Sequence, residues 1–276
     1  MQTVDAHGAR IPALGFGTWR LSGEACAQAV AEALRTGYRH IDTAAAYGNE
    51  DRVGEGLRAS GVPRDEVFVT TKVMPQDLAD RAFQVSLDRS LEQIGIGQVD
   101  LVLIHWPSRD LPVAETIASL NHARSRGAAR HIGVSNFTVG LLREAWAASD
   151  APLVTNQCEY HPYLRQDAVI GACREWGMAF TAYSPLGRQR VLDDPVITGI
   201  ATRHGRSPAQ VVLRWELQQP GVVTIPKSAT PARIRENFDI FDFMLDDAEM
   251  AAISGLGETH RQRLANFGGL APDWDD

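Results

Sequence analysis

The sequence predicts an α/β fold, a (β/α)8 TIM barrel with an N-terminal β-hairpin that closes the barrel floor. Three observations predict it: short apolar runs recur along the chain, helical patterns lie between most of them, and the spacing is fairly regular. Strands alternating with helices pair in parallel through right-handed crossovers, and eight such units can close into a barrel. The alternative is an open doubly wound sheet, which would have fewer strands and a reversal of strand order.

The candidate strands are apolar runs that each close on a polar or small residue. Parallel strands covered by helices have this nearly continuous apolar character. In chain order the runs are LGFG at 14–17, HID at 40–42, VFVTTK at 67–72, VDLVLIH at 99–105, HIGVSN at 131–136, LVTNQ at 153–157, AFTAYS at 179–184 and VVTIPK at 222–227.

Helical patterns occupy the intervals between these runs. Apolar residues over 83–94 recur at spacings of four, four and three, which places one stripe on a helix. Ser207, followed by proline and then by Gln210, predicts a helix start with a capping box, and Thr230 followed by proline predicts another. The long interval 184–222 leaves room for an extra loop or helix.

The N-terminal segment predicts a hairpin, because QTV and RIPA flank the turn AHGA. Such a hairpin would plug the barrel floor. No linker, low-complexity tract or charge block divides the chain, so residues 1–276 are expected to form a single domain.

Composition narrows the class of protein. The chain is 44% hydrophobic and 22% charged, which is typical of a globular enzyme, and its net charge of −7 gives no global attraction to nucleic acid or anionic lipid. The three cysteines are odd in number and form no CxxC, so a reducing compartment is expected rather than a disulfide framework or zinc site. No secretion signal or spanning segment is evident, so the expected location is cytoplasmic.

Polar residues end the candidate strands, at the face of a barrel where catalytic residues gather. Each has an ordinary structural interpretation: a turn cap for Asp42, a solvated strand end for Lys72, a core position for His105 and loop packing for Tyr47. Together these interpretations weaken, because buried charges must be paired. The strand-closing residues are Asp42, Lys72, His105, Asn136, Gln157, Ser184 and Lys227.

These residue types suit one kind of chemistry. A tyrosine is a weak acid, and an adjacent lysine ammonium favours its phenolate and lowers its pKa. An aspartate would hold the lysine charged, and a histidine could donate a hydrogen bond to a substrate oxygen. The set makes a general acid where an oxygen acquires charge, as in carbonyl reduction by hydride, and requires no metal.

Motifs along nearly the whole chain resemble the aldo-keto reductase superfamily. The resemblance implies a (β/α)8 barrel and a catalytic tetrad of Asp42, Tyr47, Lys72 and His105, with Tyr47 as proton donor. The motifs are GFGTW at 15–19, GYRHIDTAAAYGNE at 37–50, TTK at 70–72, LIHWP at 103–107, GVSNF at 133–137, NQ at 156–157 and IPKSATPARIRENFDIFDF at 225–243.

The resemblance also implies a nicotinamide cofactor held without a Rossmann fold. The single GxGxxA match, at 54–59, lies in a helical region that follows no strand, so it is rejected as a phosphate loop. By resemblance, an amide clamp, a stacking tyrosine and a pyrophosphate segment complete the site. The corresponding residues are Gly17, Thr18, Asp42, Ser135, Asn136, Gln157, Tyr183, Ser184, Leu186 and Gly187.

The segment KSATPARIREN is expected to select NADPH. Arg233 falls in the first turn of the predicted helix, where a cation opposes the helix dipole unless an anion binds. The family pattern places Lys227, Ser228 and Arg233 around the 2'-phosphate, and Glu236 and Asn237 on the adenine. The alternative is that Arg233 simply points to solvent.

Substrate residues are expected next to the tetrad. Trp19, Met74, Trp106 and Phe137 follow strand-end residues and would line an apolar mouth, together with Tyr47 and His105; loop packing is the alternative. Met74 replaces the tryptophan common in the family. Arg109, Arg188 and Arg190 could attract an acidic sugar, or could be surface residues.

Short loops and the GLAPDWD tail most resemble bacterial 2,5-diketo-D-gluconate reductases, especially the B-type branch, and imply an open mouth. The expected substrate is a small carbonyl compound such as a keto-sugar or methylglyoxal, and the expected state is a monomer. Two other functions remain open: a cofactor-binding sensor without turnover, and a barrel hydrolase or aldolase that uses Lys72 as a Schiff base.

Overall fold

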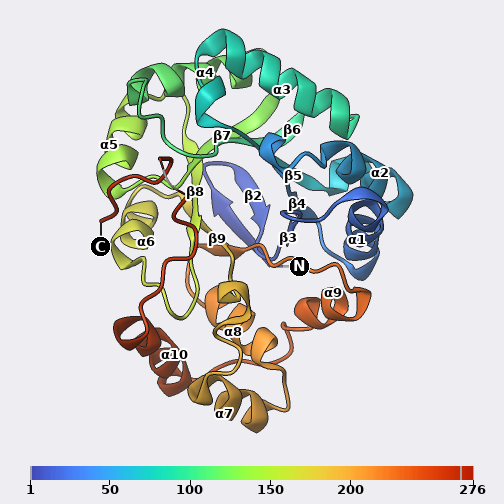
Figure 1. Cartoon of the computed structure of the whole chain (residues 1–276), viewed down its shortest axis with the longest axis vertical. Coiled ribbons are helices and arrows are strands. Elements are labelled where there is room, and N and C mark those ends of the chain that lie inside the picture. Colours follow the sequence, from blue (N-terminus) through green and yellow to red (C-terminus); the bar gives the residue numbers. More distant parts are fainter. Residues whose placement is uncertain (1, 268, 276) are drawn as a thin grey trace.

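A computed structural model of the chain describes residues 2–267 and 269–275. Within these ranges, eight parallel strands form one curled sheet surrounded by helices, so the (β/α)8 barrel is confirmed (Figure 1). The strands are β3 (Phe16–Gly17), β4 (His40–Asp42), β5 (Phe68–Val73), β6 (Val99–Ile104), β7 (Ala129–Ser135), β8 (Leu153–Glu159), β9 (Ala179–Tyr183) and β10 (Val222–Thr224).

The barrel closes between its first and last strands. Gly15 donates its backbone N–H to the Thr224 carbonyl at 2.8 Å, and Thr224 donates to the Ala13 carbonyl at 2.8 Å. A further bond of 3.0 Å joins Gly17 N to Pro226 O. A Cβ at Gly17 would lie 3.0 Å from the Ile225 carbonyl, so glycine permits this close approach.

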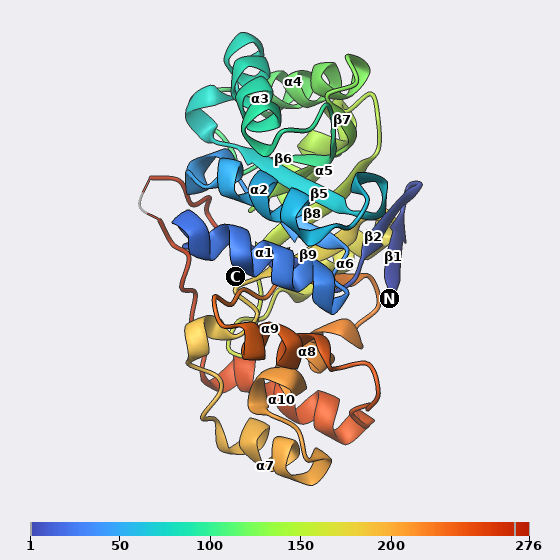
Figure 2. The same cartoon turned by 90° about the vertical axis from the view of Figure 1, so that its right-hand side faces the viewer.

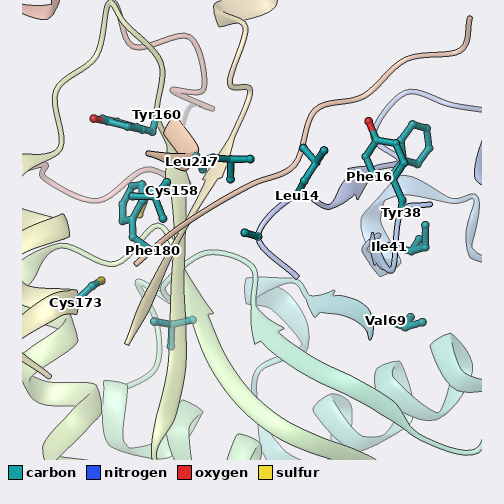
Figure 3. Packing of buried hydrophobic residues seen from close by; sticks show 14 of the residues in the cluster. Leu14, Phe16, Tyr38, Ile41, Val69, Cys158, Tyr160, Cys173, Phe180 and Leu217 are labelled. Atoms are coloured by element: carbon teal, nitrogen blue, oxygen red, sulfur yellow. The ribbon is translucent and has the colours of Figure 1, made fainter. Parts of the chain in front are cut away.

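The strands are buried on both faces, which explains their continuous apolar character. In β6, Leu101 and Leu103 face the barrel interior, whereas Val102 and Ile104 join the layer between sheet and helices. Figure 3 shows that outer layer, where Phe16 packs edge-on against Tyr38 and Phe180 packs against Tyr160. Over residues 101–104 the side chains thus alternate between the two faces, as the pleat requires.

A helix follows each barrel strand, and two further helices are added. The Ser207 capping box is present, and Thr230 is the N-cap of its helix, although its side chain makes no capping bond. The barrel helices are α1 (Gly23–Thr36), α2 (Glu50–Ser60), α3 (Asp80–Ile94), α4 (Val113–Ser125), α5 (Val139–Ala148), α6 (Asp167–Glu175), α8 (Pro208–Leu217) and α9 (Pro231–Phe238). The additions are α7 (Pro195–His204), which occupies the long interval noted above, and α10 (Asp247–Thr259).

The predicted hairpin is formed by β1 (Thr3–Ala6) and β2 (Ala9–Pro12). His7 and Gly8 turn the chain with φ of 48° and 86°, the geometry of a tight hairpin turn. Ile11 belongs to the interior hydrophobic cluster that also contains Leu101 and Leu103 of β6, Val154 and Val223. The hairpin therefore covers one end of the barrel, in the centre of the ring in Figure 1.

The C-terminal segment after α10 crosses the other side of the molecule. Figure 2 shows it at the left edge, opposite the hairpin. The mouth formed by the strand ends and the floor covered by the hairpin are therefore two different faces. No helix in residues 2–267 and 269–275 has both the length and the apolar character to cross a membrane.

Candidate active site

A cavity of about 640 Å³ opens where the strands end. Its walls come from almost every strand-to-helix connection, which brings residues from the whole chain together. The lining residues that the sequence predicted are Gly17, Thr18, Trp19, Asp42, Tyr47, Met74, His105, Trp106, Asn136, Gln157, Tyr183, Ser184, Leu186 and Lys227.

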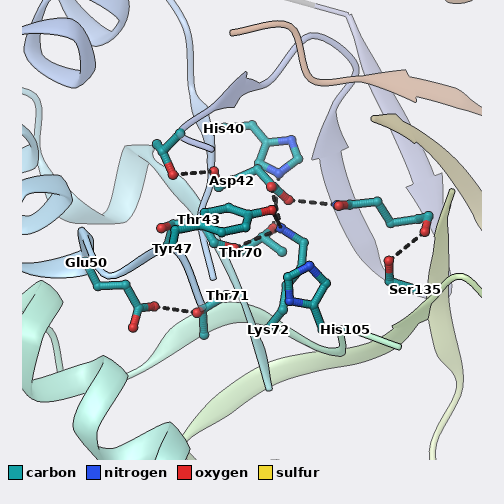
Figure 4. Close-up of polar contacts among 12 residues, drawn as sticks. His40, Asp42, Thr43, Tyr47, Glu50, Thr70, Thr71, Lys72, His105 and Ser135 are labelled. Carbon is teal, nitrogen blue, oxygen red and sulfur yellow. Dashed lines mark hydrogen bonds and ion pairs between the residues drawn. The ribbon is translucent and has the colours of Figure 1, made fainter. Parts of the chain in front are cut away.

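Asp42, Lys72 and Tyr47 form a chain of polar contacts at the wall of this cavity (Figure 4). Lys72 Nζ lies 2.5 Å from Asp42 Oδ1 and 3.4 Å from the Tyr47 hydroxyl, and it donates to the Thr43 carbonyl at 2.9 Å. The other carboxylate oxygen of Asp42 accepts a bond of 2.7 Å from Gln157 Nε2. Asp42 and Lys72 are both buried. A buried charge needs a nearby opposite charge, and each of these two side chains supplies it to the other.

Asn49 ties the loop between Asp42 and Tyr47 to the connection that follows β3. Its Nδ2 donates to the carbonyls of Thr18 at 3.0 Å and Leu21 at 2.8 Å, and its Oδ1 accepts from Thr43 Oγ1, in the loop, at 3.4 Å. Tyr47 ends a short 3₁₀ turn, and Gly48 then turns the chain with φ of 62°. Asn49 is 2% exposed and acts as a buried brace for this loop, a role that sequence reasoning did not identify.

Burial and charge set the protonation of this chain. Burial alone would lower the pKa of Lys72, but the attraction of Asp42 and then of Tyr47 outweighs it, so its pKa is raised. For Tyr47, burial raises the pKa more than Lys72 lowers it. The sequence predicted that Lys72 lowers the pKa of Tyr47, and Lys72 does so, but desolvation of the phenolate is the larger effect and raises the pKa overall. At neutral pH, Lys72 is the ammonium and Tyr47 the phenol.

His105 stands beside Tyr47 at the end of β6. The two ring centroids are 5.7 Å apart and the rings meet edge-on at 76°. Burial and the nearby Lys72 charge hold the pKa of His105 well below its ordinary value, so the ring is neutral. Its buried Nδ1 has no hydrogen-bond partner among the described residues. The backbone is fixed by a bond of 2.9 Å from Asn136 Nδ2 to the His105 carbonyl.

The residues of the predicted amide clamp lie side by side. Tyr183 donates its hydroxyl proton to Asn136 Oδ1 at 2.8 Å, and Asn136 Nδ2 lies 3.0 Å from Ser135 Oγ. Ser135 Oγ donates to the Gln157 carbonyl at 2.7 Å. Asn136 has a φ of 63°, in the left-handed region that a non-glycine residue occupies at a cost.

The other predicted cofactor residues lie around the last strand and α9. Lys227 lines the cavity, and Arg233 is exposed in the first turn of α9. Ser228 is buried, and its Oγ accepts the Thr230 N–H at 3.0 Å. Glu236 is partly exposed and Asn237 is buried on α9, while Gly187 begins a 3₁₀ turn, η4 (Gly187–Gln189), with φ of 53°.

The predicted substrate residues divide into two groups. Trp19, Met74 and Trp106 line the cavity. Phe137 is not among the lining residues: it is 0% exposed and packs in the hydrophobic layer between sheet and helices. The packing interpretation therefore describes Phe137.

The C-terminal segment also lines the cavity. Phe267 packs edge-on against Trp19 at 6.4 Å and against Trp106 at 6.0 Å, and Ala265 and Leu270 line the wall beside it. The short tail therefore reaches over the mouth. Nothing in the local sequence marks these residues, because they come together only through distant contacts.

A buried carboxylate holds this segment in place. Glu159, 0% exposed at the end of β8, accepts bonds of 2.7 Å from the backbone N–H of Leu264 and of Ala265. It also accepts a bond of 3.0 Å from His161 Nε2. Burial opposes ionisation, but these three donors outweigh it and lower the pKa of Glu159. The ionised Glu159 side chain thus anchors Leu264 and Ala265 in one wall of the cavity.

The chain was compared with known proteins. The profile of the aldo/keto reductase family matches residues 13–258. A morphine 6-dehydrogenase from Pseudomonas putida is 46% identical over 266 residues, covering 91% of this chain and 89% of that protein. A glyoxal reductase from Bacillus subtilis strain 168 is 42% identical over 261 residues, or 94% of each protein.

Solved structures agree with these relatives. A crystal structure attributed to a candidate 2,5-diketo-D-gluconic acid reductase B is 48% identical, with a TM-score of 0.96, over 100% of this chain and 98% of that one. The fold and the site together define a β/α-barrel oxidoreductase. The chain belongs to the aldo/keto reductase family.

Among the described residues, no three His, Cys, Asp or Glu side chains are grouped so that they could hold a metal ion.

Proposed function

We propose that this protein reduces aldehydes, small dicarbonyls and keto-sugars with NADPH, with Tyr47 as the general acid. The observation that carries the proposal is the Asp42–Lys72–Tyr47 chain at the wall of a cavity. Methylglyoxal and 2,5-diketo-D-gluconate are representative substrates, since relatives include a glyoxal reductase and a structure attributed to a diketogluconate reductase.

Tyr47 supplies the proton that the carbonyl oxygen needs. The phenol is the donor form, and its raised pKa keeps it protonated until the substrate oxygen acquires negative charge. The Lys72 ammonium, 3.4 Å away, then stabilises the phenolate that remains, and solvent returns the proton. Asp42 keeps Lys72 charged throughout the cycle.

His105 orients the carbonyl. A neutral imidazole keeps one ring N–H, which donates to the substrate oxygen without adding a second positive charge beside Lys72. The aromatic walls formed by Trp19 and Trp106 exclude water from the reacting atoms.

The residues around the cavity fit NADPH. When bound, it supplies the hydride that the carbonyl carbon accepts. Ser135, Asn136 and Gln157 would hold its nicotinamide amide, with Tyr183 against the ring. In the described part of the chain, Lys227 and Arg233 form no ion pair, so both cations are available to the 2'-phosphate with Ser228.

The remaining assigned residues have supporting positions in this proposal. Glu236 and Asn237 on α9 would contact the adenine, while Gly17, Thr18, Ser184, Leu186 and Gly187 would follow the pyrophosphate and ribose. The proposal also includes a monomeric state and a location in the cytoplasm. The location is supported by the free cysteines Cys26, Cys158 and Cys173, which suit a reducing compartment.

Tyr47→Phe tests the catalytic role. This variant should lose reduction of methylglyoxal at least a hundredfold in kcat while NADPH still quenches its protein fluorescence with a nearly unchanged Kd, because the hydroxyl acts in chemistry rather than in cofactor binding. Near-normal turnover would refute the role. Wild-type protein that binds NADPH but reduces none of methylglyoxal, glyoxal, a nitrobenzaldehyde and 2,5-diketo-D-gluconate would support the sensor alternative.

Arg233→Ala tests cofactor selection. It should weaken the binding of NADPH far more than the binding of NADH. Arg235→Ala, on the same helix but paired with Glu32, should change the affinity for neither cofactor. Equal loss for both cofactors would contradict the 2'-phosphate assignment.

The Schiff-base alternative is disfavoured by Lys72 itself. An amine nucleophile must be deprotonated, whereas Lys72 is buried against Asp42 with a raised pKa. Trapping of a substrate on Lys72 by borohydride, without nicotinamide, would reverse this conclusion.

A further inference from the structure

Two arginines stand over one tryptophan at the rim of the cavity. The guanidinium carbon of Arg20 lies 4.4 Å from the ring centroid of Trp19, and that of Arg188 lies 5.1 Å from it. Arg20 follows β3 and Arg188 lies in η4 after β9, so two distant loops supply the pair. Both arginines have left-handed backbones, with φ of 63° and 51°. Residues held in such conformations gather at ligand sites.

The cavity carries positive charge that nothing in it balances. Among the residues that the structure describes, its one acidic lining residue is Asp42, which is already paired with Lys72. Arg20, Arg188 and Lys227 are its basic lining residues, and no carboxylate pairs with them within residues 2–267 and 269–275. The chain as a whole has a net charge of −7. A local positive field in an acidic protein draws anions to this mouth.

The neighbouring arginines are engaged elsewhere. Arg109 Nη2 donates to the Ala271 carbonyl at 2.5 Å, and Arg190 Nη1 donates to Gln262 Oε1 at 3.1 Å. Both therefore contact the C-terminal part of the chain. Within the described part of the chain, no side chain or carbonyl accepts from Arg20 or Arg188, so the N–H groups of this pair remain for a ligand while the guanidinium groups lie over Trp19.

The aromatic wall connects this pair to the catalytic residues. Trp19 contacts Phe267, and Phe267 contacts Trp106, which follows His105 in the chain. Lys227, in contrast, lies after β10 beside Ser228, where the 2'-phosphate is proposed to bind. We propose that Arg20 and Arg188 form a carboxylate subsite that favours carbonyl substrates bearing an acid group at the end remote from the reacting carbonyl. This inference rests on the proposed reductase function and specifies its substrate class.

A matched pair of substrates tests the subsite. 4-Carboxybenzaldehyde and its methyl ester carry the same aldehyde and differ in charge. With NADPH, the variant Arg20→Gln/Arg188→Gln should lose about tenfold or more in kcat/KM for the acid, and less than twofold for the ester. The loss should appear in KM, because the interaction holds the ground state and the transition state alike. Added salt should lower the kcat/KM of the wild-type protein for the acid but not for the ester.

Controls separate the possible outcomes. Arg190→Gln, an exposed arginine two residues from Arg188, should treat both substrates as wild type does. Equal losses for acid and ester, with a raised KM for NADPH, would overturn the proposal and assign the pair to the cofactor pyrophosphate. Wild-type protein that reduces neither aldehyde would instead refute the reductase function itself.

Discussion

Replacing Asp42 by asparagine tests whether Lys72 is held as a buried cation. The change keeps the shape of the side chain but removes the charge that lies 2.5 Å from Lys72 Nζ. Lys72 is 0% exposed, so water cannot take over the role of Asp42. The introduced amide would also have to face the Gln157 amide, which now donates to Asp42 Oδ2 at 2.7 Å.

The expected cost follows from the depth of the pair. Two unit charges about 4 Å apart attract by about 4 kcal/mol at an effective dielectric constant near 20. Breaking a buried pair by removing one partner typically costs about 3–5 kcal/mol. We therefore expect the free energy of unfolding at pH 7 to fall by about 3–5 kcal/mol, and the thermal midpoint to fall by roughly 6–20 °C for a chain of this size.

The loss should shrink as the pH rises. In the wild type, the raised pKa of Lys72 gives stability that is present below the pKa of the unfolded chain and is lost only as pH rises through the folded value. In the variant, burial remains without Asp42, so the pKa of Lys72 falls and the unfolded chain binds the extra proton. Variant stability should then rise from pH 7 to pH 9.5 relative to wild type.

Urea unfolding of both proteins at pH 7 and pH 9.5 measures this difference. Asp5→Asn is the control, because its partner Arg10 lies 3.8 Å away and both side chains are exposed, so the loss should stay below about 1 kcal/mol. A loss below about 1 kcal/mol for Asp42→Asn, or one independent of pH, would refute the reasoning.

Three further predictions concern packing, the mouth and the thiols. A Cβ at Gly54 would lie 2.1 Å from the Ile94 carbonyl, whereas Gly97 has nothing within 4 Å, so Gly54→Ala should cost about 2 kcal/mol or more and Gly97→Ala far less in thermal unfolding; equal midpoints would contradict this. Glu159→Gln should loosen the C-terminal segment, so trypsin should cut after Arg261 or Arg263 faster and the KM for substrate should rise. Glu258→Gln changes an exposed side chain and should alter neither the cleavage rate nor KM. An unchanged cleavage rate for Glu159→Gln would count against the anchor. Burial raises the pKa of Cys26 to about 11 and of Cys158 to about 12, and it also raises the pKa of Cys173. A disulfide reagent at pH 8 should therefore label the three thiols only after urea unfolds the protein. Rapid labelling of the native protein would contradict this prediction.

The barrel could be predicted because each strand has a recognisable local pattern in the sequence. Its apolar residues must face both the interior and the helices, so the run is continuous and ends abruptly at the mouth. Strand ends were harder: the run at 222–227 continues beyond β10, which ends at Thr224. Ile225 still donates to the Ala182 carbonyl of β9 at 3.1 Å, but Pro226 has no N–H with which to extend the ladder. The helix α10 was not predicted.

The rejected glycine motif has a packing explanation. Gly54 and Gly56 lie in α2, where a Cβ would collide with the Ile94 carbonyl and with the Ala27 carbonyl. The glycines therefore let α2 approach its two neighbouring helices, and local spacing alone resembled a phosphate loop.

The centre of the site was accessible to sequence reasoning, but its periphery was not. Asp42 ends β4, Lys72 is the next-to-last residue of β5 and His105 directly follows β6, so the fold itself predicts their convergence. The net pKa direction of Tyr47 depends on burial, which no spacing reports. Arg20, Phe267 and Leu270 join the cavity through loop geometry and distant contacts, so only the folded chain reveals them.

The anchored C-terminal segment has a consequence for the order of assembly. Its bonds to Glu159 span 105 and 106 residues, and the bond of Arg109 to Ala271 spans 162. All eight strands precede these residues, so a growing chain can complete the barrel before the wall that Phe267 contributes exists. The C-terminal wall of the cavity is thus synthesised after all the strands. Removing this wall by shortening the chain would alter substrate selectivity before it altered the barrel.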